Sequence, residues 1–375
     1  MKIERRELKG NCLHDFPYPR GRRKCPHSIL ISATESGGCL FRCPICYARA
    51  YPWSKDAEII IYNNLIEKLR REIGKAYRLF PIYLSQVTDP LQPLKEIREL
   101  TRAVVSLLME YNLSFGIVTK SADGPLALLR DLPKLKEYPY WFLTITIEAT
   151  PEKQVVTSPF ASPIPKRFRT ISYFNHRLKI PAIVRIDPTI LGIMDKEDLT
   201  YLLDKAWESG SPHIIGSTGY FNKTSILRVA KAIKNSPFAS RLKSFFRYYR
   251  FNPERISTYS ERKRFTVSLP MRIRFHTWLR KEVEKRNMTY AVCQELPKEY
   301  DSQGIPSCEG AKNIFVSIRN SSGKFQPIPC HGDCLRFCPE PKNPPCGYQN
   351  FLTEYPFKYQ SLFLPPSLPL FSLNS

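Results

Sequence analysis

The chain has 375 residues, enough for two or three ordinary domains or one large α/β unit, and its 33 prolines and only 16 glycines exclude a collagen-like or Gly-rich disordered protein. Lys and Arg number 57 against 34 Asp and Glu, and this net charge of +23 indicates a polyanionic partner. No run of about 18 apolar residues is present, and the basic N-terminus lacks the apolar stretch of a signal peptide, so we expect a soluble, cytoplasmic protein with no membrane partner.

After a basic N-terminal extension at 1–27, the chain alternates β-branched runs with amphipathic stretches. Strands are predicted at 28–33, 81–87, 114–118, 141–147, 180–186 and 213–217. Helices are predicted at 63–77, 94–111, 124–132, 165–173, 196–209 and 223–233. Six strand–helix units predict a parallel sheet with right-handed crossovers. We therefore expect an α/β fold, a partial (β/α)6 TIM-type barrel over 28–240, with its active site at the carboxyl ends of the strands.

The last part of the chain differs in composition. Residues 221–290 carry 18 Lys and Arg against 4 Asp and Glu, and residues 293–346 hold six of the eleven cysteines. We expect 241–375 to form a basic, Cys-rich C-terminal extension that includes a basic helix at 270–287.

A cysteine triplet follows the first predicted strand: Cys39, Cys43 and Cys46, with three and two residues between them. An odd cysteine total and the absence of a secretion signal argue against a disulfide framework. Three thiolates on one loop can bind three irons of a cubane cluster and leave the fourth iron open. A closed zinc site needs a fourth nearby ligand, which this loop lacks, although a structural zinc loop remains the alternative.

This loop resembles the signature of the radical S-adenosylmethionine (SAM) superfamily, and the expected six-unit barrel agrees with it. The resemblance implies a [4Fe-4S] cluster whose open iron chelates SAM. It also implies reductive cleavage of SAM to a 5′-deoxyadenosyl radical, fed by an electron donor such as ferredoxin or flavodoxin. Tyr47 stands where that family usually has an aromatic residue near the adenine.

A narrower resemblance, to the spore photoproduct lyase or DNA repair photolyase-like branch, covers about residues 28–300. The motifs that carry it lie at 85–93, 117–121, 144–146, 165–167 and 184–188. It implies that SAM is bound by Thr88, Asp89, Lys120 and Thr146, and Arg185 is a further candidate partner for a carboxylate or phosphate. One departure matters: no cysteine precedes Asp89, where the lyase has its hydrogen-atom donor, which puts dimer repair by that route in doubt.

A second cysteine cluster lies in the C-terminal region. Its members are Cys330, Cys334, Cys338 and Cys346. Four thiolates in a Pro-rich segment predict a second metal centre, either an auxiliary iron–sulfur cluster or zinc. Buried free thiols are the alternative.

The stretch 241–250 interleaves cations with aromatic rings, as proteins that contact phosphates and stack unpaired bases do. We therefore expect a radical SAM enzyme that acts on a nucleic acid, DNA or RNA, by lyase-type repair or base modification. Two alternatives stay open. One is the same chemistry on a protein or small-molecule substrate, and the other is a non-enzymatic, zinc-stapled nucleic-acid-binding protein.

Overall fold

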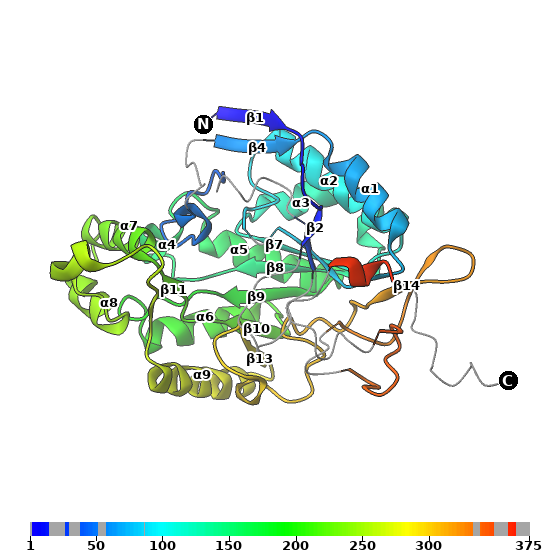
Figure 1. The fold of residues 1–375 in the computed structure, drawn as a ribbon. Coiled ribbons are helices and arrows are strands. Elements are labelled where there is room, and N and C mark those ends of the chain that lie inside the picture. The colour runs from blue at the N-terminus through cyan, green and yellow to red at the C-terminus, as the bar shows by residue number, and fades with distance from the viewer. Residues whose placement is uncertain are drawn as a thin grey trace.

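The computed structural model describes residues 2–14, 27–29, 38–51, 58–85, 87–332, 338–348 and 359–364. Its centre is a mixed α/β fold built on a mainly parallel sheet (Figure 1). Each of the six predicted strands is present, and the observed bounds are β3 His27–Ile29, β6 Ile82–Leu84, β7 Phe115–Thr119, β8 Trp141–Thr146, β9 Ala182–Ile186 and β10 His213–Gly216. This sheet is consistent with the predicted partial barrel.

The sheet is one strand longer than predicted on its parallel side. Strand β13 (Thr289–Val292), from the region expected to be an extension, pairs in parallel with β10, with His213 opposite Thr289. At the other edge β2 (Leu13–His14) pairs antiparallel with β3. The complete order is β13-β10-β9-β8-β7-β6-β3-β2. The sequence signal for β13 is weak because the strand is only four residues long.

Helices connect the strands, as the right-handed crossover rule expects. Their bounds are α1 Leu65–Lys75, α2 Lys95–Glu110, α3 Asp123–Asp131, α4 Gln154–Thr157, α5 Ile164–Ser172, α6 Lys196–Glu208, α7 Lys223–Lys234, α8 Leu242–Tyr248 and α9 Leu269–Glu284. A π-helix at Tyr173–Leu178 extends α5. Helices α6 and α7 begin with capping boxes, in which Asp195 pairs with Asp198 and Asn222 with Ser225.

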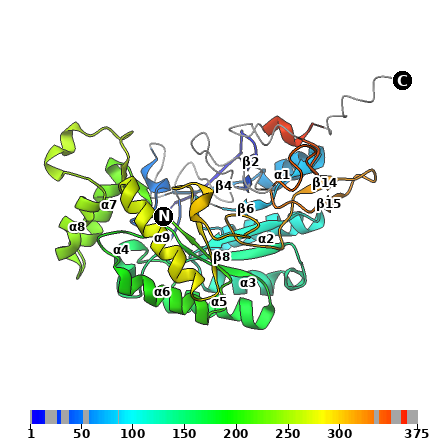
Figure 2. The same cartoon turned by 90° about the horizontal axis from the view of Figure 1, so that it is seen from below.

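Both faces of the sheet are covered, which explains why β8 is buried at every position. One face contributes to the main core with the helices, which line that side of the sheet in Figure 2. The other face carries a smaller apolar cluster that includes Tyr83 and Phe142. Ala311 and Ile314, from the C-terminal region, pack on this cluster. The C-terminal region thus fills part of the barrel interior.

Short strands outside the main sheet tie distant segments together. Strand β1 (Lys2–Arg6) pairs with β4 (Glu58–Tyr62). Strand β5 (Arg78–Leu79) joins the hairpin of β14 (Ser317–Arg319) and β15 (Phe325–Pro327), and β11 (Tyr220–Phe221) pairs with β12 (Phe265–Thr266). Within the described ranges, no helix is long and apolar enough to cross a bilayer.

Candidate active site

Parallel strands end at a common edge, and the residues that follow them are polar. They are Thr88 and Asp89 after β6, Lys120 after β7, Glu148 after β8, Asp187 after β9, Ser217 after β10 and Cys293 after β13. The cysteine loop follows β3 at the same edge, ending in the short 3-10 helix η1 (Ala48–Ala50). Polar side chains therefore gather at the edge where the active site is predicted.

The three cysteines of the triplet lie on one tightly turned loop. Cys43 is buried and Cys39 and Cys46 are half-buried. Burial, and then the charge of Asp89, raises the pKa of Cys39 to about 12, while hydrogen bonds from the Asp89 and Phe41 backbones oppose the rise. Burial also raises the pKa of Cys43, and the charges of Cys39 and Cys46 add to that rise. The three sulfurs therefore lie within electrostatic range of one another.

Two arginines bind the carbonyl groups of this loop. Arg49 donates from Nη1 to the carbonyl oxygens of Arg42 (2.5 Å) and Cys43 (3.2 Å). Arg228, on α7, donates to the carbonyls of Pro44 (2.8 Å), Cys46 (2.5 Å) and Arg49 (3.2 Å). Helix α7 therefore fixes the cysteine loop although it is far away in sequence.

Gln92 links the cysteine loop to the loop after β6. Its Oε1 accepts the Leu40 N–H at 2.8 Å, and its Nε2 donates to the Asp89 carbonyl at 3.1 Å. The Asp89 carboxylate accepts from the Lys120 N–H (2.6 Å) and the Thr119 hydroxyl (2.8 Å). Burial raises the pKa of Asp89, against these hydrogen bonds. Asp89 therefore organises the edge of the sheet.

Lys120 faces a buried ion cluster. Its Nζ lies 3.7 Å from Oε2 of Glu148, and the same oxygen lies 3.1 Å from Nη1 of Arg167. Arg167 also donates to the Thr146 carbonyl at 2.8 Å, which holds the end of β8. Although burial raises the pKa of Glu148, the charges of Lys120 and Arg167 outweigh it and lower that pKa to about 2. Glu148 is therefore an anion at neutral pH.

Arg185 is bound on both sides by carboxylates of this chain. It lies 2.7 Å from Asp187 and 2.8 Å from Glu309, and its Nη1 is 3.5 Å from the Cys293 sulfur. The partner Glu309 comes from the C-terminal region and enters the barrel beside Tyr83. Burial raises the pKa of Tyr83, and the charge of Glu309 adds to the rise. The predicted role of Arg185 toward a ligand stays a prediction, because its strongest partners here are these two carboxylates.

Three tyrosines, Tyr47, Tyr51 and Tyr220, lie in or beside the cysteine loop. Tyr47 packs edge-on against Tyr51 with ring centroids 6.0 Å apart. Burial raises the pKa of Tyr47, and the charges of Tyr51, Cys46 and Tyr220 add to the rise. Tyr220 on β11 is 50% exposed. Tyr47 directly follows Cys46, and its predicted place near the adenine stays a prediction. Thr88 is buried, with its hydroxyl 3.3 Å from that of Ser85.

The triplet has the donor chemistry of an iron–sulfur site. Three thiols lie on eight consecutive residues, and soft thiolates are the ligands that such clusters take. Among the residues that the structure describes, no three His, Cys, Asp or Glu side chains converge on the position of a single metal ion. The fit of Cys39, Cys43 and Cys46 to a cluster rests on the chemistry and spacing of the three thiols, and the cluster stays a prediction.

The structure describes three of the four cysteines of the second predicted metal centre. Cys334 lies outside the described residues. Cys330 and Cys346 are buried, and Cys338 is half-buried. Burial raises the pKa of Cys346, and the nearby charge of Cys338 adds to the rise. This metal centre stays a prediction.

The basic lobe, residues 236–264, projects beyond the sheet next to α7 (Figure 1). Its eight exposed cations are Arg241, Lys243, Arg247, Arg250, Arg255, Arg262, Lys263 and Arg264. The predicted stacking role of its aromatics is wrong for Phe245 and Tyr249. These two rings are fully buried, with centroids 5.1 Å apart, because they anchor the lobe in the core.

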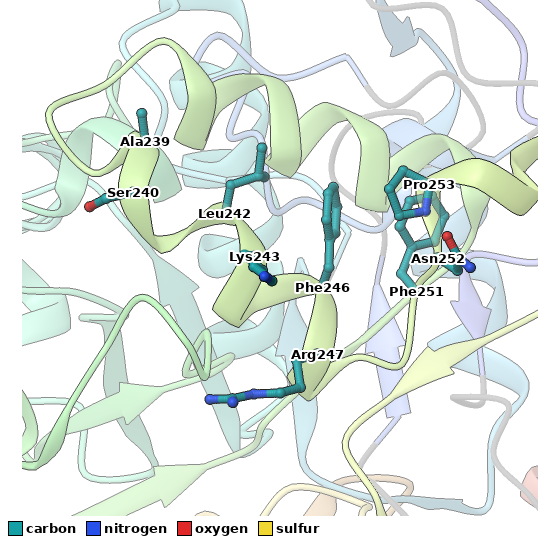
Figure 3. Close-up of a pocket in the computed structure, with 9 residues that line it drawn as sticks. All are labelled: Ala239, Ser240, Leu242, Lys243, Phe246, Arg247, Phe251, Asn252 and Pro253. Carbon is teal, nitrogen blue, oxygen red and sulfur yellow. The ribbon is translucent and has the colours of Figure 1, made fainter.

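A surface pocket of about 500 Å³ opens on this lobe (Figure 3). Phe246 and Phe251 line it with ring centroids 5.1 Å apart, and Lys243, Arg247 and Pro253 are among the other residues that line it. Within the described residues, neither Lys243 nor Arg247 has a carboxylate at ion-pair distance. Aromatic surface and free cations therefore meet at one place.

Comparison with known proteins gives a sequence relative. A protein of Pseudomonas phage M6 named radical SAM Nα-GlyT isomerase is 22% identical over 320 residues, which are 82% of this chain and 62% of that protein. This match supports the radical SAM superfamily. The chain spans 62% of the length of that relative, and the match does not show the spore photoproduct lyase branch. No family model matches.

Among solved structures, Streptococcus suis SuiB bound to S-adenosylmethionine matches with a TM-score of 0.37 and 12% identity, over 56% of this chain and 46% of that one.

Sequence reasoning missed four residues that organise this edge: Arg228, Gln92, Glu148 and Glu309. Glu148 follows a predicted strand directly, so its position alone could have identified it. Arg228 sits on an ordinary amphipathic helix, and Glu309 in an irregular segment, so neither carries a local signal.

Proposed function

We propose that this chain is a radical SAM enzyme that holds a [4Fe-4S] cluster on Cys39, Cys43 and Cys46 and cleaves SAM reductively. The single observation that carries the proposal is the triplet's position at the carboxyl edge of the parallel sheet, facing Lys120 and Glu148. When bound, the cluster supplies the electron that splits SAM into methionine and a 5′-deoxyadenosyl radical. A ferredoxin or flavodoxin is the proposed source of that electron.

The chain's own residues provide groups for the two ends of SAM. Lys120 has three N–H donors, and within the described residues the carboxylate at ion-pair distance from its Nζ, that of Glu148, is 3.7 Å away, so Lys120 can still bind the SAM carboxylate. Thr88 and Thr146 offer short polar side chains beside it, and Tyr47 supplies a ring for the adenine. The Asp89 carboxylate accepts the Leu91 N–H of its own loop at Oδ1 and the Lys120 N–H of the loop after β7 at Oδ2. We therefore assign Asp89 the positioning of Lys120, in addition to the predicted contact with the SAM amino group.

We propose a nucleic acid as the substrate. The basic lobe adjoins the candidate site through α7, and its exposed cations face solvent. Cations bind phosphates, while a partly exposed ring such as Phe246 can stack an unpaired base. The name of the phage relative is that of an isomerase, and we favour base modification by rearrangement over lyase-type repair. The lack of a cysteine ahead of Asp89 agrees with that choice.

The test is 5′-deoxyadenosine formation from SAM by the reconstituted protein, anaerobically, with a strong reductant and with or without DNA or RNA. Cys39→Ala should abolish product, whereas Cys12→Ala, which removes a buried thiol against α1, should retain it. Product that rises with one nucleic acid supports the full proposal. If the amount of 5′-deoxyadenosine is the same with and without DNA or RNA, the substrate is a protein or a small molecule. An iron-loaded protein that forms no product contradicts the proposed chemistry.

The basic lobe is tested separately by binding. Lys243→Gln/Arg247→Gln should weaken binding of an unpaired oligonucleotide and reduce the magnitude of the slope of log K against log salt by about 1.4. The matched control is Lys134→Gln/Lys136→Gln, which removes two exposed cations from the 3-10 helix Pro133–Lys136, ahead of β8. Equal losses in both variants would mean that the lobe is not the interface.

A further inference from the structure

We propose that Arg228 is a positioning residue for the cysteine loop and that its charge raises the reduction potential of the cluster bound there. The inference rests on the proposed function, because it concerns the cluster assigned to Cys39, Cys43 and Cys46. Arg228 is 182 residues away from Cys46 in sequence and donates three hydrogen bonds to consecutive parts of its loop. A planar guanidinium can satisfy three such acceptors at once, whereas an ammonium on a flexible stem is a point charge.

Arg228 is supplied by a helix that is itself fixed at the same place. The N-cap of α7, Asn222, accepts the Ser225 N–H at 2.9 Å and donates from Nδ2 to the Ala50 carbonyl at 3.3 Å. Ile226, Val229 and Ile233 are buried along the opposite side of the helix. The guanidinium therefore has a defined position relative to the loop, which a side chain from a solvent-exposed loop would lack.

Arg49 completes the arrangement from within the loop. It binds the carbonyls of Arg42 and Cys43, and Arg42 has a φ of 41°, in the left-handed region that a side chain disfavours. Arg49 cannot tie the loop to the barrel because it belongs to the loop. Arg228 makes that connection, so losing it should free the segment that carries Cys43 and Cys46.

The charge has a second consequence. Reduction adds one negative charge to a cluster, and the potential of a cluster depends on nearby charge and hydrogen bonding. A guanidinium fixed against the Cys46 carbonyl favours the reduced state, so removing it should make the potential more negative. A residue with a purely structural role would leave the potential of the retained clusters unchanged.

The experiment compares Arg228→Met and Arg228→Lys with a matched control, Arg319→Met. Arg319 also donates to several backbone carbonyls, among them those of Ala76, Ile73 and Gly74 at the end of α1. All variants are loaded anaerobically with iron and sulfide. Iron release to a chelator, the electron paramagnetic resonance spectrum of the reduced cluster and its potential are then measured, with circular dichroism as the folding check.

We expect Arg228→Met to lose iron about 10-fold more readily and to have a more negative potential. Arg228→Lys should restore the reduction potential but not the retention of iron, because lysine restores the charge without the three hydrogen bonds to the loop. Arg319→Met should match wild type in both. If Arg228→Met retains iron and has the reduction potential of wild type, this inference is wrong but the proposed function stands. The same holds if Arg319→Met changes iron retention and potential as much as Arg228→Met does. A wild-type protein that forms no iron–sulfur cluster overturns this inference together with the proposed function.

Discussion

The buried carboxylate of Glu148 gives the sharpest prediction for stability. Both Glu148 and Arg167 have fully buried side chains, and Lys120 is 18% exposed. Glu148→Gln keeps the shape but removes the negative charge between two cations. The pKa of Glu148 falls from 4.5 to about 2 on folding. Because each pKa unit corresponds to about 1.36 kcal/mol, the ionised carboxylate contributes roughly 3 kcal/mol to the free energy of unfolding.

The assay is urea unfolding of wild type and Glu148→Gln between pH 7 and pH 2. Because the folded pKa lies below the unfolded one, the contribution is fully present above about pH 4.5 and is lost as the pH falls toward 2. The difference between the proteins should therefore be near 3 kcal/mol at pH 7 and shrink only in acid. Glu99→Gln, in an exposed pair with Lys95, should change stability by less than about 0.5 kcal/mol. A difference below about 1 kcal/mol at pH 7, or one independent of pH, would refute the reasoning.

Two further predictions concern the loop contacts and the lobe. Gln92→Leu should lower the free energy of unfolding by about 1–3 kcal/mol, because it leaves the Leu40 N–H and the Asp89 carbonyl without their partner. Urea unfolding that is unchanged from wild type would show that these groups find other partners. Phe245→Ala should cost about 3–5 kcal/mol because its ring is fully buried, whereas Phe246→Ala should mainly weaken oligonucleotide binding. Similar unfolding losses in both Phe variants would mean that the lobe packs differently.

Much of the fold follows from local sequence pattern. The helix predicted at 94–111 is observed as Lys95–Glu110, because Ile97, Val104 and Leu108 recur at helical spacing and are buried together. The strand predicted at 141–147 is observed as Trp141–Thr146. The sequence also placed the cysteine triplet after the first strand, and in a parallel sheet that position implies the carboxyl edge.

Other features depended on contacts between distant segments. Strand β13 joins the sheet through pairing with β10, and four residues without a flanking repeat give no periodic signal. From the sequence, Phe245 and Tyr249 are expected to be available for stacking with bases. The helical turn instead directs both rings into the core, whereas Lys243 and Arg247 are exposed.

By itself the sequence determined the α/β class, the order of six strand–helix units, the cysteine triplet and the excess of positive charge, because composition, periodicity and spacing are local properties of the chain. Only the tertiary structure decided which groups meet. Arg228 binds the cysteine loop across 182 residues, and Glu309 reaches Arg185 across 124. Hydrogen bonds and ion pairs require positions fixed to within an ångström or so, and at such sequence separations only the packed core supplies that precision.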